Sequence, residues 1–218
     1  SALTKNLVSE GHNIYSLVRR KPAQNEFYWN AKDQIDLPKN TKIDAVVHLS
    51  GENVAAGRWS KKIKQRIYES RILSTRLLVE RLSALDTPPL TFICASAVGI
   101  YGDRKDTILL ESTTEDPSAN GFLVSVAKDW EQEAQKYTQN IANARVINAR
   151  IGIVLSPDGG ALEKMLPVFK MGMGGPLGDG KQYMSWISLT DLVSAFSFCL
   201  DNNSAEGAFN FCSPNPMT

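Results

Sequence analysis

The sequence of 218 residues has few of the side chains that cross-link small secreted domains or bind structural metals. Its three cysteines, Cys94, Cys199 and Cys212, are odd in number, widely spaced and set in apolar surroundings. This pattern predicts reduced, buried thiols in a cytoplasmic protein. The two histidines, His12 and His48, are far apart and show no ligand-like spacing, so we expect no structural metal.

The chain also lacks a dominant charge and a long apolar run. It has 24 basic and 23 acidic residues, which predicts no broad surface for nucleic acid or for an anionic membrane. No segment approaches the roughly 18 apolar residues of a membrane span, and no secretory signal opens the sequence. We therefore expect a soluble, cytoplasmic protein that recognises a small-molecule substrate locally.

Strand and helix patterns alternate, which predicts one α/β domain with a doubly wound parallel sheet. Apolar strands are expected over residues 12–18, 43–49, 91–95, 145–155, 183–189 and 209–212, with an edge strand near 27–29. Helices are expected over residues 1–10, 60–82, 123–137, 161–170 and 190–200. Ser60 is the expected N-cap of the second helix, and Thr190 and Asp191 are expected to cap the last. The expected inward stripe of the second helix is Ile63, Ile67, Leu73, Leu77 and Leu78, and that of the third is Leu123, Val126, Trp130, Ala134 and Tyr137. A helix that opens such a chain normally follows a strand, so we expect the first strand to be missing.

Residues 91–103 carry the strongest indication of a site. Their apolar start is typical of a strand buried on both faces, and it turns small and polar at Ser96. Open α/β sheets bind ligands at the carboxyl ends of their strands, so Ser96 and Tyr101 are candidate site residues. A purely structural strand and glycine-containing loop would show the same pattern.

Two further strand ends carry residues suited to a dinucleotide. Arg19 and Arg20 follow the strand at 12–18, where an arginine fork would accept a 2'-phosphate, although a solvated basic loop explains them equally well. The small residues Ser50 and Gly51 follow the strand at 43–49 and would let a cofactor approach the backbone. An ordinary strand-to-helix turn would look the same.

Residues 175–181 match the front of a phosphate loop, GxxxxGK. Gln182 stands where Ser or Thr would hold magnesium, and Asp179 would face phosphate with like charge. A strand rather than a helix is expected after Lys181. A P-loop nucleotidase is therefore kept only as a remote alternative.

Several blocks of the chain resemble the extended short-chain dehydrogenase/reductase superfamily, within its cell-division-inhibitor-like nucleotide-sugar epimerases. The blocks are HLSGEN at 48–53, RWSKKIKQRIYESR at 58–71, SAVGIYG at 96–102, FLVSVAKDWE at 122–131, the glycine-rich stretch 159–191 that ends in WISLTD, and FNFCSPNP at 209–216. The resemblance implies a Rossmann-like, NAD(P)-binding domain over residues 1–218, with 156–190 on the substrate side. It also implies that the glycine-rich loop before Ser1 and a continuation after Thr218 are missing.

The resemblance implies NADP(H) in preference to NAD(H), with Arg19 and Arg20 at the adenosine phosphate. The other implied cofactor-binding residues are Leu49, Ser50, Gly51, Arg71, Ala95, Lys128 and Val154. Ser96 corresponds to the serine that binds the substrate carbonyl or hydroxyl. Relatives often dimerise through their long helices, so a homodimer is one expectation, although the apolar stripe at 63–78 would serve as core equally well.

One departure concerns the YxxxK motif, in which tyrosine is the acid/base and lysine lowers its pKa. Lys128 is present, but Val124 stands at the tyrosine position. Tyr101 or Tyr183 is the candidate substitute, and Lys128 could equally be an exposed helix lysine. Two functions stay open: an NADP(H)-dependent epimerase or oxidoreductase of a sugar-nucleotide-like substrate, and a non-catalytic NADP(H) sensor.

Overall fold

The core of the computed structural model is a four-stranded parallel sheet between two layers of helices. Its strands lie in the order β4 (Ala45–His48), β5 (Thr91–Ala97), β6 (Arg145–Ile151) and β9 (Gly207–Phe211). All three neighbouring pairs run parallel. The structure describes residues 1–55, 57–113, 121–176 and 178–218. The expected α/β fold class is confirmed.

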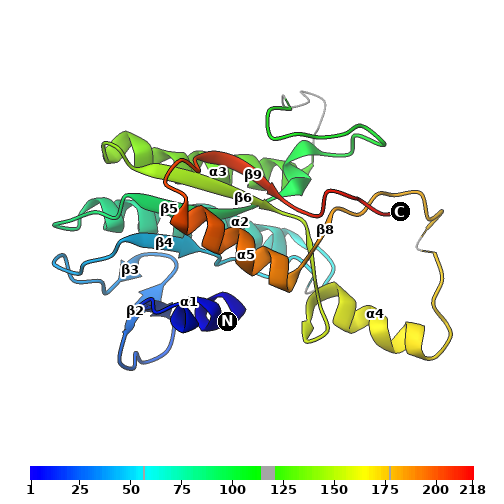
Figure 1. The fold of residues 1–218 in the computed structure, drawn as a ribbon, viewed down its shortest axis with the longest axis horizontal. Helices are drawn as coiled ribbons and strands as arrows, with labels where there is room; N and C mark the ends of the chain where they lie inside the picture. The colour runs from blue at the N-terminus through cyan, green and yellow to red at the C-terminus, as the bar shows by residue number, and fades with distance from the viewer. Residues whose placement is uncertain (56, 114–120, 177) are drawn as a thin grey trace.

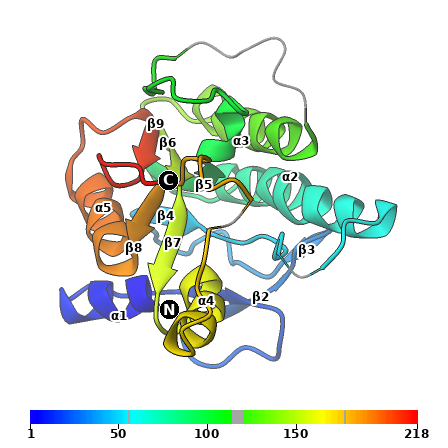
Figure 2. The same ribbon diagram turned by 90° about the vertical axis from the view of Figure 1, so that its right-hand side faces the viewer.

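Helices cover both faces of this sheet (Figures 1 and 2). They are α1 (Ala2–Ser9), α2 (Lys61–Ser83), α3 (Phe122–Asn140) and α5 (Leu189–Asp201). Phe92 and Cys94 of β5 pack with α2 and α3, whereas Ile93 between them packs with α1 and α5. This alternation of side chains follows from the period of two residues in a strand. Among the described residues, no helix has the length and apolar character needed to cross a membrane.

Shorter strands flank the main sheet. β1 (Ser16–Val18), β2 (Glu26–Asn30) and β3 (Gln34–Ile35) form one further sheet, and β7 (Ile153–Ser156) and β8 (Trp186–Ser188) form another. β1 is parallel to β2, which is antiparallel to β3, and β7 is parallel to β8. Within the described residues, β1 pairs only with β2 and β4 pairs only with β5.

The long helix α2 begins where the sequence predicts, because Ser60 caps it by accepting the N–H of Ile63. Its buried stripe differs from the expected one. Ile63, Leu73 and Leu77 are only half-buried. The buried side chains are Ile67, Ile72, Ser74, Thr75, Leu78, Val79 and Leu82. The stripe is shifted and includes hydroxyls because α2 packs against both the sheet and α3.

Three expected boundaries need correction. The strand predicted over 145–155 is two strands, β6 and β7, separated at Gly152, where a Cβ would stand 2.6 Å from the carbonyl oxygen of Ser185. Helix α5 is capped by Ser188 rather than by Thr190 and Asp191, since the Ser188 hydroxyl accepts the N–H of Asp191. The regular part of the strand predicted over 12–18 is Ser16–Val18.

Candidate functional site

A hollow of about 330 Å³ lies at the carboxyl ends of β1, β2 and the main-sheet strand β4. Residues that follow these strands line it, together with the first half of α2; they include Arg19, Asn30, Lys32, Glu52 and Arg66. The carboxyl edge of an open α/β sheet is where such folds bind ligands. This volume falls within the range of roughly 300 to 1,000 Å³ that is usual for small-molecule sites. We call it the adenosine-side hollow, after the part of the cofactor that the sequence predicts near Arg19.

The lining of the adenosine-side hollow carries three basic and two acidic side chains. Arg19, Lys32 and Arg66 are the basic ones, Glu52 and Glu69 are the acidic ones, and the carboxylate of Glu52 pairs with Arg66. Tyr28 and Trp29 supply aromatic surface. Basic side chains beside flat rings suit a ligand that carries both a phosphate and a heteroaromatic base.

The structure places Arg20 beside the hollow rather than in its lining. Both Arg20 guanidinium nitrogens donate to Glu26, Nη1 to Oε2 at 2.7 Å and Nη2 to Oε1 at 2.6 Å. The Ala23 N–H also donates to Glu26 at 2.8 Å. The Arg20 hydrogen bond, followed by that of Ala23, lowers the pKa of the Glu26 carboxyl. Arg19 lines the hollow directly.

Arg71 of α2 holds the turn after β4 through hydrogen bonds to backbone carbonyls. The Arg71 guanidinium donates to the carbonyl oxygens of Glu52 at 3.1 Å and Ile67 at 3.2 Å, and it lies 5.1 Å from the ring centroid of Trp130. Gly51 leaves room for it, because a Cβ there would stand 2.9 Å from Arg71 Cζ. Burial lowers the pKa of Arg71. Arg71 thus holds the turn that the sequence assigns to the cofactor.

Leu49 and Ser50 begin this turn. Leu49 is 45% exposed, so a large apolar side chain faces outward directly after a buried strand. Ser50 is half-buried and Gly51 is exposed. Leu49 therefore offers an accessible apolar surface at the carboxyl edge of the sheet, where a ligand ring could pack.

A connected polar cluster lies further along the same carboxyl edge of the sheet, at the ends of β5, β6 and β9. The Ser96 hydroxyl donates to Glu131 Oε1 at 2.6 Å. Arg150 clamps the same carboxylate, with Nε and Nη2 each 2.9 Å from one of its oxygens. Arg150 Nη1 also donates to the Tyr101 hydroxyl at 2.8 Å, and that hydroxyl donates to Asn210 Oδ1 at 2.7 Å. The carboxyl ends of β5, β6 and β9 thus share one network.

The sheet register explains how this cluster forms. Ser96, Arg150 and Asn210 are register partners on β5, β6 and β9 and so form one row across the sheet. Ser96 has the same parity as Phe92 and Cys94, so its side chain points to the α3 layer. Ser96 is 4% exposed and Tyr101 is 5% exposed. Both hydroxyls therefore belong to the interior.

The remaining predicted residues differ in their burial and in the elements that carry them. Ala95 is buried in β5, and Val154 on β7 packs against the apolar cluster beneath α5. Lys128 is half-buried on α3, one turn after Val124. Val124 is 8% exposed, whereas Tyr183 is 53% exposed.

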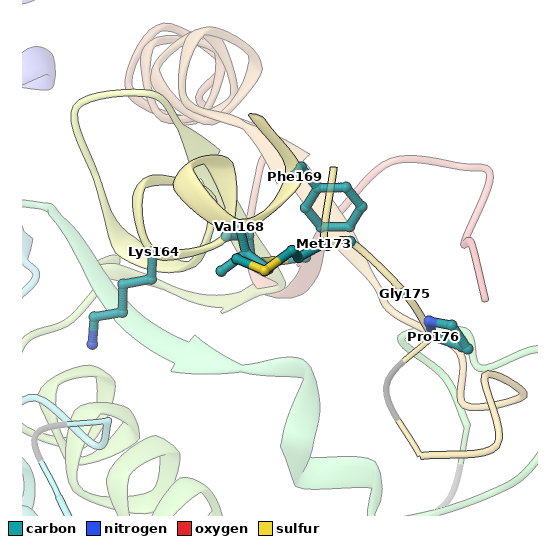
Figure 3. A pocket seen from close by; sticks show the side chains of 8 residues that line it. Lys164, Val168, Phe169, Met173, Gly175 and Pro176 are labelled. Atoms are coloured by element: carbon teal, nitrogen blue, oxygen red, sulfur yellow. The ribbon is translucent and has the colours of Figure 1, made fainter. Parts of the chain in front are cut away.

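A second hollow, of about 370 Å³, lies on α4 (Gly160–Lys170) and the glycine-rich stretch after it. Figure 3 shows Val168, Phe169 and Met173 gathered around it, with Lys164 pointing away from them. Gly174 lets the Phe169 ring lie against the backbone, because a Cβ at this position would stand 2.3 Å from the ring. We call it the α4 hollow. It lies within the segment expected on the substrate side.

The same stretch does not form a phosphate loop. A P-loop lysine stands at the start of a helix, whereas the first helix after Lys181 is α5, which begins at Leu189 beyond β8. Residue 177 of the motif lies outside the described residues. The remote alternative of a P-loop nucleotidase is therefore wrong.

Comparison with known proteins agrees with the geometry. The model of the NAD dependent epimerase/dehydratase family matches residues 1–212. The chain belongs to the NAD dependent epimerase/dehydratase family.

Individual members of the NAD dependent epimerase/dehydratase family are similar over the whole chain. Epimerase family protein Mb2239 of Mycobacterium bovis is 42% identical over 100% of this chain and 71% of its own length. The solved nucleoside-diphosphate sugar epimerase of Corynebacterium glutamicum is 33% identical, with a TM-score of 0.84, over 100% of this chain and 44% of that chain. Human epimerase family protein SDR39U1 (isoform 2), solved with NADPH, is 28% identical, with a TM-score of 0.87, over 99% of this chain and 71% of its own.

Reasoning from the sequence missed several residues of the adenosine-side hollow and of the polar cluster around Ser96. Glu131, Arg150 and Asn210 were not singled out, although Arg150 is a charged residue near the end of an otherwise buried strand. Such a residue needs a buried partner, which is a usable signal. Lys32 and Arg66 of the adenosine-side hollow carry no comparable signal, because surface lysines and arginines are common.

Proposed function

We propose that the chain is the NADP(H)-binding part of an epimerase or oxidoreductase that acts on a sugar-nucleotide-like small molecule. The observation that carries the proposal is the adenosine-side hollow, in which Arg19, Lys32 and Arg66 stand at the carboxyl ends of parallel strands beside two aromatic rings. The NADPH in the structure of human SDR39U1 supports the cofactor, and the name of the Corynebacterium glutamicum relative supports the substrate class.

The residues present fit NADP(H) in chemistry. Arg19, with Arg20 beside it, would hold the 2'-phosphate, and Leu49 would pack along the adenine with Ser50 at the ribose. Gly51 would admit the dinucleotide close to the backbone, and Lys128 would reach the ribose from α3. Bound NADP(H) would supply reversible hydride transfer. Ala95 and Val154 would border its nicotinamide end, and the α4 hollow would border the substrate.

Ser96 and Tyr101 are assigned to the reacting end of this site, at the carboxyl end of β5. Their hydroxyls both connect to Arg150, Ser96 through Glu131 and Tyr101 directly. Ser96 would orient a substrate oxygen if its proton turned from Glu131, and Tyr101 is the acid/base candidate. Tyr183, which is accessible, is the second candidate.

A second function, a non-catalytic NADP(H) sensor, is favoured by one observation. Val124 is buried at the position of the usual tyrosine, and both candidate hydroxyls at the end of β5 already have internal partners. Both functions require NADP(H) binding, and only the enzyme would transfer hydride.

Titration of the full chain with NADPH and NADH tests the shared part. We expect tighter NADPH binding, and we expect Arg19→Ala and Arg20→Ala to weaken NADPH binding while leaving NADH affinity unchanged. Equal affinities for the two dinucleotides would refute the 2'-phosphate assignment. A screen of sugar nucleotides for hydride exchange then separates the functions: exchange that Tyr101→Phe or Tyr183→Phe abolishes supports the enzyme, and tight NADPH binding without exchange supports the sensor.

A further inference from the structure

The ion pair between Arg20 and Glu26 lies at the edge of the adenosine-side hollow. It is bidentate, with both nitrogen–oxygen distances below 2.8 Å. Arg20 is 64% exposed along its side chain, whereas Glu26 is 16% exposed. Arg20 is therefore accessible from solvent while its fork is engaged by a carboxylate from the first residue of β2.

Glu26 is held in place for this contact. Its Oε2 accepts the N–H of Ala23 at 2.8 Å, and its backbone N–H donates to the Ala23 carbonyl. Arg20 Nη1 also donates to the Lys21 carbonyl at 3.1 Å. The turn between β1 and β2 thus presents carboxylate and guanidinium to each other in a fixed geometry.

A carboxylate and a phosphate offer an arginine fork the same feature, two oxygens that accept parallel hydrogen bonds. They therefore compete for one guanidinium. NADPH carries a 2'-phosphate that would accept hydrogen bonds from Arg20, and NADH lacks this phosphate. Only NADPH would therefore have to replace Glu26 as the partner of the Arg20 guanidinium.

We propose that Glu26 is a specificity-determining residue that lowers NADPH affinity by occupying Arg20, and so narrows the preference for NADPH over NADH. This inference rests on the proposed NADP(H) function. Glu26 would weaken NADPH binding through Arg20 alone, without touching the cofactor.

Substitution Glu26→Gln in the full chain tests the inference, because glutamine keeps an acceptor for the Ala23 N–H but loses the charge. An exposed ion pair is weak, so we expect NADPH to bind about two- to five-fold more tightly. NADH affinity should not change. The matched control Glu80→Gln removes an exposed carboxylate from α2 and should leave both affinities unchanged. Thermal unfolding of each variant confirms that it is folded.

A double variant shows whether the effect passes through Arg20. Arg20→Ala combined with Glu26→Gln should bind NADPH as weakly as Arg20→Ala alone. Weaker NADPH binding by Glu26→Gln, no change, or an equal gain for both cofactors would overturn the inference while leaving the proposed function standing. Failure of the wild-type chain to bind either dinucleotide would overturn both.

Discussion

Ser96 on β5 and Arg150 on β6 are register partners, and both bind the carboxylate of Glu131 on α3. Arg150 makes this carboxylate a fixed acceptor, since two of its nitrogens hold both oxygens. The pKa of Arg150 is raised, first because its side chain donates to Glu131. The serine that sequence similarity assigns to substrate is therefore also part of the packing between sheet and helix.

Substitution Ser96→Ala separates these two roles. Loss of one hydrogen bond to a charged group should lower the free energy of unfolding by about 1 to 2 kcal/mol, because Arg150 still satisfies Glu131. Urea denaturation measures this loss. NADPH affinity should be unchanged. Loss of hydride exchange with an unchanged unfolding free energy would contradict a packing role and identify Ser96 as a catalytic residue.

Removal of Arg150 should be far more damaging. Both Arg150 and Glu131 are only 13% exposed along their side chains, so Arg150→Met leaves a buried carboxylate unpaired and should cost about 3 to 5 kcal/mol. Adding Glu131→Gln should recover part of that loss in a double-mutant cycle. Arg76→Met should cost about 1 kcal/mol or less, because the Arg76 side chain is 47% exposed and Lys136 still pairs with the buried carboxylate of Glu133. Equal losses for the two arginines would contradict this ranking.

His48 should make stability depend on pH. It is 3% exposed, and its pKa is lowered from 6.5 to about 4, first by burial and then by the charge of Arg71. Below pH 6.5 the unfolded chain binds a proton that the folded protein does not, so stability falls as pH falls, until the folded pKa is reached. The total loss is roughly 3 kcal/mol.

Denaturation between pH 7 and 5 tests this expectation, because this window lies above the usual titration of carboxylates. The variant His48→Gln cannot take up the proton and should show a flatter profile. If the unfolding free energy of the wild type and that of the variant fall equally steeply with pH, a group other than His48 causes the pH dependence.

Arg145 should be essential for the attachment of α5 to the sheet. Its buried guanidinium donates to Thr91 Oγ1 and to the carbonyl oxygens of Cys199, Leu200 and Ala205. Since Arg145→Ala would leave helix-end carbonyls without donors, it should lower the unfolding free energy by about 3 kcal/mol or more. Arg145→Lys should lose less unfolding free energy than Arg145→Ala, and the exposed control Arg58→Ala should lose little. A loss below about 1 kcal/mol for Arg145→Ala would contradict the role of Arg145 in attaching α5.

The sequence alone determined the layers of this protein. Apolar runs such as the one before Ser96 and the helical spacing of Val126, Trp130 and Tyr137 are local patterns, and local patterns report which face of an element is buried. The same reasoning correctly placed the Ser60 cap and the strand end before Arg19, and it placed the strand end before Gly51 to within one residue. The predicted cofactor preference and site residues remain predictions.

Only the tertiary structure decided which polar groups meet. Ser96, Glu131, Arg150 and Asn210 come from three strands and a helix, and the parallel register brings them into one network. In the same way, the turn between β1 and β2 joins Arg20 to Glu26. Which polar groups become partners depends on the register between strands and on the conformation of the turns. Hydrophobic periodicity carries no information about either, because it records burial and not which neighbour satisfies a buried charge.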